Sequence, residues 1–227
     1  MPLPLVMCDL DGTLIDSSPL YFQGVPAVVR KFLGLDVTPE DLRPFWGQLA
    51  RNFFVHFVAR TGAPESAVDE MYAAFEDYYN REHNRICRIY DTVPESIDRL
   101  RDAGFKVGVV TTRPTSRSRP VLELPLARKL DFIVWGDQVA HPKPAPDGLE
   151  LALEAGGAPR AGGIYIGDNA NDIFAARACR YPTRSAAALW DALNLESLAA
   201  AGPDAAFETF AAFAGWVIEI GKNGNSQ

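Results

Sequence analysis

Hydrophobic and polar residues follow two different patterns along this chain, and the difference predicts two kinds of structure. After residue 104, short apolar runs alternate with stretches of helical spacing. This order is typical of a parallel sheet built from strand–helix–strand units, so we expect an α/β fold. The alanine-rich stretch 186–214 favours further helix over an edge or face of the sheet. Strands are predicted at Leu5–Cys8, Phe105–Val110, Phe132–Trp135 and Gly163–Ile166, and helices at Pro94–Ala103, Pro146–Ala155 and Asn169–Ala178.

Residues 17–89 show the second pattern. They contain no strand-like run, and apolar residues such as Phe53 and Phe57 recur at helical spacing. Gly34–Pro39 and Thr61–Pro64 supply breaks between the expected helices. The predicted organisation is an all-helical insert at 17–89, a core formed by 1–16 and 90–222, and a polar tail at 223–227.

Composition narrows the class of protein. The chain has 227 residues, of which 48 % are hydrophobic and 22 % charged, as in folded globular proteins. The net charge is −7 and no basic run occurs, which argues against binding to nucleic acid or to an anionic membrane surface. No apolar run approaches the roughly 20 residues of a membrane helix. The three cysteines lack the spacing of a zinc site or disulfide framework, so a cytoplasmic location is expected.

The first candidate site follows the first predicted strand. Asp9 and Asp11 lie two residues apart and precede Gly12 and Thr13. Side chains two apart on an extended backbone share a face, so both carboxylates can point to one place. One could attack a substrate while the other moves a proton. An ordinary acidic turn would have the same composition.

Three further segments carry candidate chemistry. Asp168 and Asp172 lie one helical turn apart and could face a hard cation, although helix capping also explains them. Thr111 and Thr112 end another strand and offer donors for phosphate oxygens. Lys143 is held between two prolines. Each signal is weak alone, but all fall at the carboxyl ends of strands, where open α/β sheets bind ligands.

Together, Asp9-Leu10-Asp11-Gly12-Thr13, Thr111, Lys143 and Gly167-Asp168 with Asp172 resemble, in order, the motifs of the haloacid dehalogenase superfamily. The resemblance is to the phosphatase branch with a helical cap, in the phosphoglycolate phosphatase and β-phosphoglucomutase subgroup. It implies a Rossmann-like core with helices on both faces, interrupted by the cap. Two details depart from the family pattern: Thr112 stands where asparagine is frequent, and Ala178-Cys179-Arg180 where an Ala-Gly pair is usual.

The resemblance also implies residue roles. Asp9 would be the nucleophile that forms an aspartyl-phosphate, and Asp11 the general acid and base. Mg²⁺ would be held by Asp9, Asp168 and the backbone carbonyl of Asp11, with Asp172 close by. The phosphate site would comprise Gly12, Thr111, Thr112 and the catalytic Lys143.

The expected activity is Mg²⁺-dependent hydrolysis of a small phosphorylated metabolite, such as phosphoglycolate, a sugar phosphate, a nucleotide or pyrophosphate. Asp11 favours phosphoryl chemistry, because dehalogenases of this family have no carboxylate there. A phosphoglucomutase-like isomerase and a non-catalytic phosphate-binding protein are the alternatives. The oligomeric state is not indicated. Candidate contacts to the leaving group in the insert are Arg43, Trp46, Gln48, Arg51 and His56.

Overall fold

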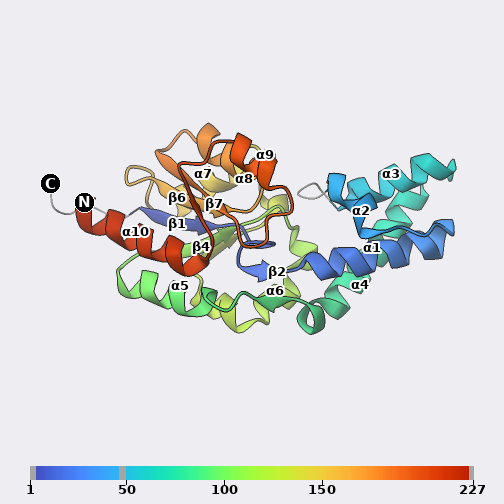
Figure 1. Ribbon diagram of the computed structural model, residues 1–227, viewed down its shortest axis with the longest axis horizontal. Coiled ribbons are helices and arrows are strands. Elements are labelled where there is room, and N and C mark those ends of the chain that lie inside the picture. Colours follow the sequence, from blue (N-terminus) through green and yellow to red (C-terminus); the bar gives the residue numbers. More distant parts are fainter. Residues whose placement is uncertain (1–3, 46–49, 225–227) are drawn as a thin grey trace.

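The protein is built on a six-stranded parallel sheet, as the computed structural model shows (Figure 1). The structure describes residues 4–45 and 50–224. The strand order is β5-β4-β1-β6-β7-β8, which places β1 near the middle. The strands are β1 Leu5–Cys8, β4 Val107–Val110, β5 Phe132–Val134, β6 Gly163–Gly167, β7 Thr183–Ala188 and β8 Ala205–Phe207. The α/β fold class expected from the sequence is confirmed.

Helices cover both faces of the sheet because the central strand is apolar on both sides. Val6 and Cys8 belong to a core that includes residues of α5 (Val93–Asp102) and α10 (Phe210–Gly224). Leu5 and Met7 point the other way, into a core with α7 (Asp147–Ala155) and α8 (Ala170–Ala178). Alternate side chains of a strand face opposite sides, so one four-residue run serves two cores. In Figure 1 these two pairs of helices lie on opposite sides of the sheet.

The helix prediction for 186–214 is wrong at two places. Residues Thr183–Ala188 form β7 and Ala205–Phe207 form β8, while α9 (Leu195–Ala200) lies between them. Alanine favours helix intrinsically, but packing decides a buried position. The alanines at 186–188 are buried between β6 and β8. Ala187 packs against α8 and α9, whereas Ala186 and Ala188 face the core on the other side of the sheet, which includes α10.

The other boundaries differ from prediction by one or two residues. β4 begins at Val107, because Phe105 belongs to the turn after α5. Asn169 precedes α8 as its N-cap. Short helical segments complete the core: η2 Thr115–Arg117, α6 Arg119–Leu122, η3 Pro125–Lys129 and η4 Gly136–Gln138.

Within the described residues, the four α-helices between Asp16 and Arg88 form the helical insert, which extends beyond one end of the sheet (Figure 1). They have a core of their own, in which Phe53, Phe54, Phe57 and Phe75 are buried. Its helices are α1 Ser18–Leu33, α2 Pro39–Leu42, α3 Arg51–Thr61 and α4 Ala67–Ile86, with the short helix η1 Arg43–Phe45.

Two short antiparallel strands join the helical insert to the core. β2 (Ile15–Asp16) leads into it and pairs with β3 (Arg88–Ile89), which leads out. β3 therefore lies within the range 17–89 that the sequence pattern assigned to helices alone. α4 also touches the core after β4, where Asn80 Nδ2 donates to the Ser116 carbonyl at 3.1 Å.

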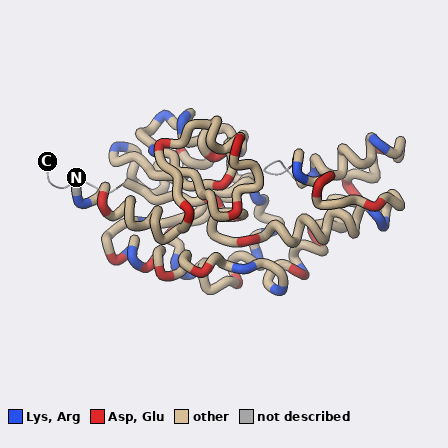
Figure 2. The backbone as a smooth tube through the Cα atoms, viewed as in Figure 1, with Lys and Arg blue, Asp and Glu red and all other residues tan. Residues whose placement is uncertain are grey.

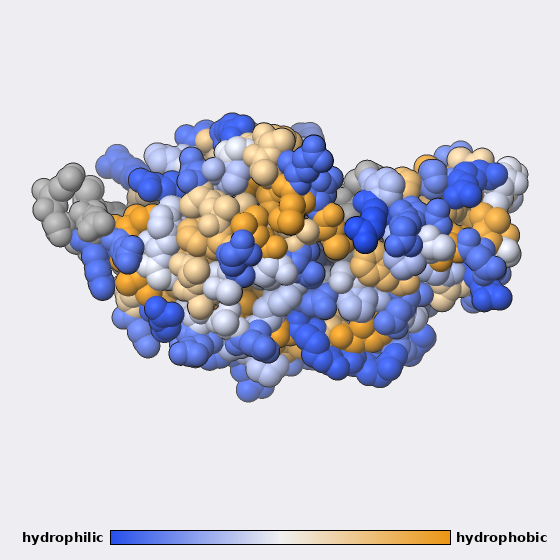
Figure 3. Space-filling model, viewed as in Figure 1, coloured by the Kyte–Doolittle hydropathy of each residue, from blue (hydrophilic) through white to orange (hydrophobic). Residues whose placement is uncertain are grey.

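The surface of the described residues carries mixed charge. Lys and Arg positions in Figure 2 are scattered among Asp and Glu over both parts of the molecule. On the face shown in Figure 3, apolar areas are interrupted by polar residues. Within the described ranges, no helix is long and apolar enough to cross a membrane.

Candidate active site

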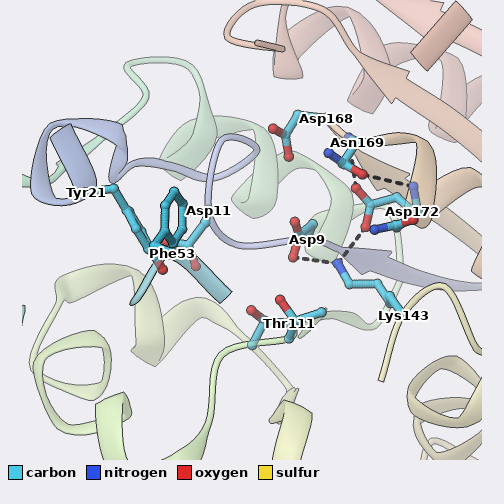
Figure 4. Close-up of a pocket in the computed structure, with 11 residues that line it drawn as sticks. Asp9, Asp11, Tyr21, Phe53, Thr111, Lys143, Asp168, Asn169 and Asp172 are labelled. Carbon is cyan, nitrogen blue, oxygen red and sulfur yellow. Dashed lines mark hydrogen bonds and ion pairs between the residues drawn. The ribbon is translucent and has the colours of Figure 1, made fainter. Parts of the chain in front are cut away.

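The candidate site lies where the strand order reverses. After β1 the chain builds β4 and β5 on one side, then crosses to β6 on the other. A crevice forms at such a switch point, beyond the carboxyl ends of the strands. The structure has a pocket there, with ≈ 590 Å³ of empty space that includes open solvent. It is lined by Asp9, Asp11, Tyr21, Phe53, Thr111, Thr112, Lys143, Asp168, Asn169, Asn171 and Asp172. Figure 4 shows these side chains.

Lys143 links two carboxylates at the floor of the pocket. Its ammonium lies 2.8 Å from Asp9 Oδ1 and 2.5 Å from Asp172 Oδ1, and it donates to Tyr165 Oη at 2.7 Å. The Lys143 side chain is only 5 % exposed, and all three of its N–H donors have partners. Burial opposes its charge, but Asp172 and Asp9 raise its pKa above the ordinary lysine value. Lys143 is therefore a permanent cation beside Asp9.

Three carboxylates beside Lys143 form a cluster that could bind a hard cation. Oxygen atoms of Asp9, Asp168 and Asp172 all lie within 4.8 Å of one another. Burial raises the pKa of Asp9 to about 7, opposed by Lys143. Burial, with the charges of Asp9 and Asp172, also raises the pKa of Asp168. One lysine does not balance three buried carboxylates, so an all-oxygen ligand set of this kind fits Mg²⁺.

The three carboxylates are not equally available to a cation. Asp172 Oδ1 accepts from Lys143 and Tyr165, and its Oδ2 accepts from the Asn169 backbone N–H at 3.0 Å. Asp168 accepts only a long hydrogen bond, 3.4 Å from Thr13 Oγ1, among the side-chain contacts described. Asp9 and Asp168 are thus the better direct ligands, and Asp172 orients Lys143. Asp172 also takes part in the capping box at the start of α8, so the capping interpretation of this motif is confirmed.

Gly12 allows the backbone to pass close to Asp168. Its φ is +78°, and a Cβ there would lie 2.4 Å from Asp168 Oδ2. We expect Gly12→Ala to cost at least about 1 kcal/mol more stability than Gly34→Ala, because Gly34 has φ +66° but no atom within 4 Å of a Cβ. Displacing Asp168 should also weaken Mg²⁺ binding roughly tenfold. Thermal unfolding and Mg²⁺ titration of both variants test this. Equal behaviour of the two would contradict it.

Asp11 lies apart from the floor of the pocket, on the side of Tyr21 and Phe53 (Figure 4). Its carboxylate accepts hydrogen bonds from Ser17 Oγ and from the Arg113 guanidinium. Burial disfavours its charge, but Arg113 outweighs that effect and lowers the pKa of Asp11 below the usual aspartate value. The two acids that are neighbours in sequence therefore have opposite electrostatic surroundings.

The two threonines, Thr111 and Thr112, directly follow β4. Both line the pocket, and Thr111 is buried. Thr111 Oγ1 accepts from the Arg113 backbone N–H at 3.1 Å, which leaves the hydroxyl proton available for an acceptor in the pocket.

Sequence reasoning missed several residues of the site. Tyr165 and Tyr21 gave no signal, because aromatic residues in strands and helices are ordinarily core. Arg113 directly follows Thr111-Thr112, so its position was noticeable, but its burial was not. His83 is likewise buried and contacts Arg113, whereas a lone histidine is usually an incidental surface or core residue.

The predicted contacts in the helical insert that the structure describes do not line this pocket. Arg43 and Arg51 are exposed and do not line this pocket, and Arg51 pairs with Asp69 at 2.6 Å. His56 packs against Phe45, with 4.7 Å between ring centroids. Trp46 and Gln48 fall outside the described residues. The helical insert instead contributes Tyr21 from α1 and Phe53 from α3.

Comparison with known proteins agrees with this geometry. Residues 6–184, which include every motif residue of the site, match the family model of haloacid dehalogenase-like hydrolases. Pyrophosphatase PpaX of Bacillus velezensis is 30% identical over 200 residues, covering 88% of this chain and 89% of that protein. PpaX of Bacillus cereus strain G9842 is 31% identical over 205 residues, with 90% and 91% covered. A crystal structure from Haemophilus somnus, named a predicted phosphoglycolate phosphatase, matches with TM-score 0.85 and 22% identity over 94% of this chain and 97% of that one.

Proposed function

The chain belongs to the family of haloacid dehalogenase-like hydrolases, and on that basis we propose that it is a Mg²⁺-dependent phosphatase acting through an aspartyl-phosphate on Asp9. One observation carries the proposal: Asp9, at the end of the central strand, meets Lys143 and Asp168 at the floor of one pocket. The substrate would be a small phosphorylated metabolite. Relatives named for pyrophosphate and phosphoglycolate make these two compounds the first to test.

Lys143 and a cation address the main electrostatic difficulty of the reaction. A carboxylate that approaches a phosphate group meets a repulsion of about 4 kcal/mol per pair of unit charges at 4 Å and an effective dielectric of 20. Lys143 holds Asp9 Oδ1 and leaves Oδ2 to attack phosphorus. Mg²⁺ held by Asp9 and Asp168 would supply further positive charge next to the phosphoryl oxygens. Thr111 and Thr112 would donate to those oxygens.

Asp11 is proposed as the general acid and base. Because Arg113 lowers the pKa of Asp11, its resting form is the carboxylate, which would have to take up a proton when substrate binds before it can protonate the leaving oxygen. The carboxylate would then accept a proton from the water that cleaves the phosphoenzyme. Its place on the side of Tyr21 and Phe53 is where a leaving group would extend from a phosphoryl group on Asp9. Residues 17–89 would then act as a cap that selects the leaving group, with Tyr21 and Phe53 as its contacts.

Mg²⁺ should both activate and stabilise this protein. At 100 times its dissociation constant, Mg²⁺ should add about 2.7 kcal/mol to the free energy of unfolding. Phosphate release should require it, and Asp168→Asn should lose both effects. Thermal unfolding and phosphate release with and without EDTA measure this. Full activity in EDTA would contradict the metal role, and isomerised sugar phosphate in place of free phosphate would favour a mutase.

The stabilisation by Mg²⁺ should also depend on pH. Burial raises the pKa of Asp9 from 3.8 to about 7. Between these values the folded state without metal holds more protons than the unfolded state, so its stability falls as pH rises. Mg²⁺ binds the deprotonated carboxylates, so the gain in unfolding temperature on adding Mg²⁺ should increase from pH 5 to pH 8. A gain that does not change with pH would contradict this assignment.

A further inference from the structure

Arg113 is buried between the core and the helical insert. Its side chain is 1 % exposed. On the core side, Nε donates to Asp11 Oδ2 at 3.1 Å and Nη2 donates to Asp11 Oδ1. Two parallel N–H donors to one carboxylate fix its plane as well as its position. Ser17 Oγ, at the start of α1, is the other side-chain donor to Asp11 described in the structure.

The opposite edge of the Arg113 guanidinium is held by α4. Nη1 lies 3.0 Å from His83 Nε2, and the guanidinium carbon lies 4.9 Å from the centroid of the Tyr79 ring. Arginine has only donors, so His83 Nε2 must accept and the ring proton must be on Nδ1. His83 Nδ1 lies 2.7 Å from Asn84 Oδ1, which accepts that proton. The position of Arg113 is therefore set by side chains of the helical insert.

A second arginine, Arg117, also packs against the Tyr79 ring but does not contact Asp11. The Arg117 guanidinium carbon lies 5.0 Å from the centroid of Tyr79, and its side chain is 5 % exposed. Its hydrogen bonds go to the hydroxyls of Tyr21 and Tyr72, at 3.2 and 3.5 Å. The two arginines are thus alike in burial and aromatic contact but differ in their contact with the acid. This difference supplies a matched control.

We propose that Arg113 is a positioning residue of the reaction. It acts through Asp11, whose carboxylate it holds in a fixed position and orientation relative to α4. The inference rests on the acid and base role proposed above for Asp11. Its physical basis is geometric: without Arg113, Ser17 alone would orient the carboxylate, which could then rotate. Misplacing a catalytic group by about 1 Å can cost roughly 100-fold in rate. The helical insert would thereby set the position of the acid, in addition to covering the pocket.

A double-mutant cycle tests whether Arg113 acts through Asp11. The variants are Asp11→Asn, Arg113→Met and their combination, assayed for kcat with 4-nitrophenyl phosphate and Mg²⁺. We expect Arg113→Met to lower kcat roughly 10- to 100-fold when Asp11 is present, and by less than about threefold when Asp11 is already asparagine. Comparable losses in the two backgrounds would overturn the proposal, because Arg113 would then act by some other route.

Control variants separate positioning from a general structural effect. Arg117→Met should change kcat by the same factor in both backgrounds, since Arg117 does not contact Asp11. Arg113→Lys keeps a cation able to reach Asp11 and should recover part of the activity lost in Arg113→Met. If circular dichroism shows that Arg113→Met does not fold, Arg113→Lys takes its place in the double-mutant cycle. Non-additivity for Arg117 as large as for Arg113 would overturn the assignment.

The same cycle distinguishes failure of the inference from failure of the proposed function. If Asp11→Asn alone leaves kcat unchanged, the acid and base role of Asp11 is wrong, and the positioning role fails with it. If Asp11→Asn is impaired but Arg113→Met is fully additive with it, only the inference about Arg113 fails.

Discussion

Asp9→Asn is expected to lower kcat for Mg²⁺-dependent hydrolysis of an aryl phosphate by at least about 10⁴-fold. The amide is not nucleophilic at phosphorus, so no aspartyl-phosphate can form. The fold should survive, because the amide oxygen can still accept from Lys143, which lies 2.8 Å from Asp9 Oδ1. Removing one of three buried carboxylates should leave the unfolding temperature without metal unchanged or higher. Phosphate release and thermal unfolding are the measurements.

Asp98→Asn is the matched control for this variant. Asp98 lies on α5, where it pairs with Lys129 on the surface, away from the pocket. Its replacement should leave kcat within about twofold, since exposed ion pairs contribute little. Substantial turnover by Asp9→Asn, with a folded protein and no return of aspartate by deamidation in its mass spectrum, would rule out Asp9 as the nucleophile.

The second large effect is expected from Lys143→Met, and it should appear in both stability and activity. Removing one partner of a buried ion pair typically costs 3–5 kcal/mol, here because Asp9 and Asp172 would be left close together without a cation. Without Mg²⁺ we therefore expect about that loss in the free energy of unfolding. Mg²⁺ should restore part of it by supplying the missing positive charge. Loss of the charge beside the transferred phosphoryl group should also lower kcat roughly 100- to 1000-fold.

Lys129→Met provides the comparison for Lys143→Met. Lys129 Nζ lies 2.5 Å from Asp98 Oδ2, but the two side chains are 32 % and 51 % exposed. Its loss should cost no more than about 1 kcal/mol and leave kcat unchanged. Urea unfolding with and without Mg²⁺ measures both pairs. If Lys143→Met is no less stable than Lys129→Met without metal, the charge balance inferred for the pocket is wrong.

The main features of the pocket could be predicted because strand ends are readable in sequence. Leu5–Cys8 and residues 163–166 are continuous apolar runs, and an acid directly follows the first of them. Parallel strands place their carboxyl ends at one edge, so Asp9 and Asp168 were expected at the same edge of the sheet, and the pairing of β1 with β6 makes them neighbours. The lysine needed the family resemblance, since a loop lysine carries no local signal of burial.

The remaining features depend on tertiary contacts that no short window of sequence contains. The alanines of β7 are buried on both faces of the sheet, Ala187 against α8 and α9 and Ala186 with Ala188 in the core that includes α10, and this packing overrides their helix propensity. Arg113, in the loop after β4, could not be assigned to Asp11 because its partners Tyr79 and His83 lie about 30 residues away, in α4. The helical insert contributed Tyr21 and Phe53 to the pocket, neither of which was among the contacts predicted from the sequence. Long-range packing, and not residue type, selected these side chains.

The pairing of β2 with β3 explains how the core accommodates the helical insert. Ile15 and Ile89 are partners in an antiparallel ladder, so the chain returns to a neighbouring position after the helical insert. The entropy of closing a flexible loop rises only with the logarithm of its length. Because the two ends are held side by side, the insertion places no more constraint on the path of the chain through the sheet than a hairpin turn would. Segments of other lengths could occupy this place without altering the order of the strands.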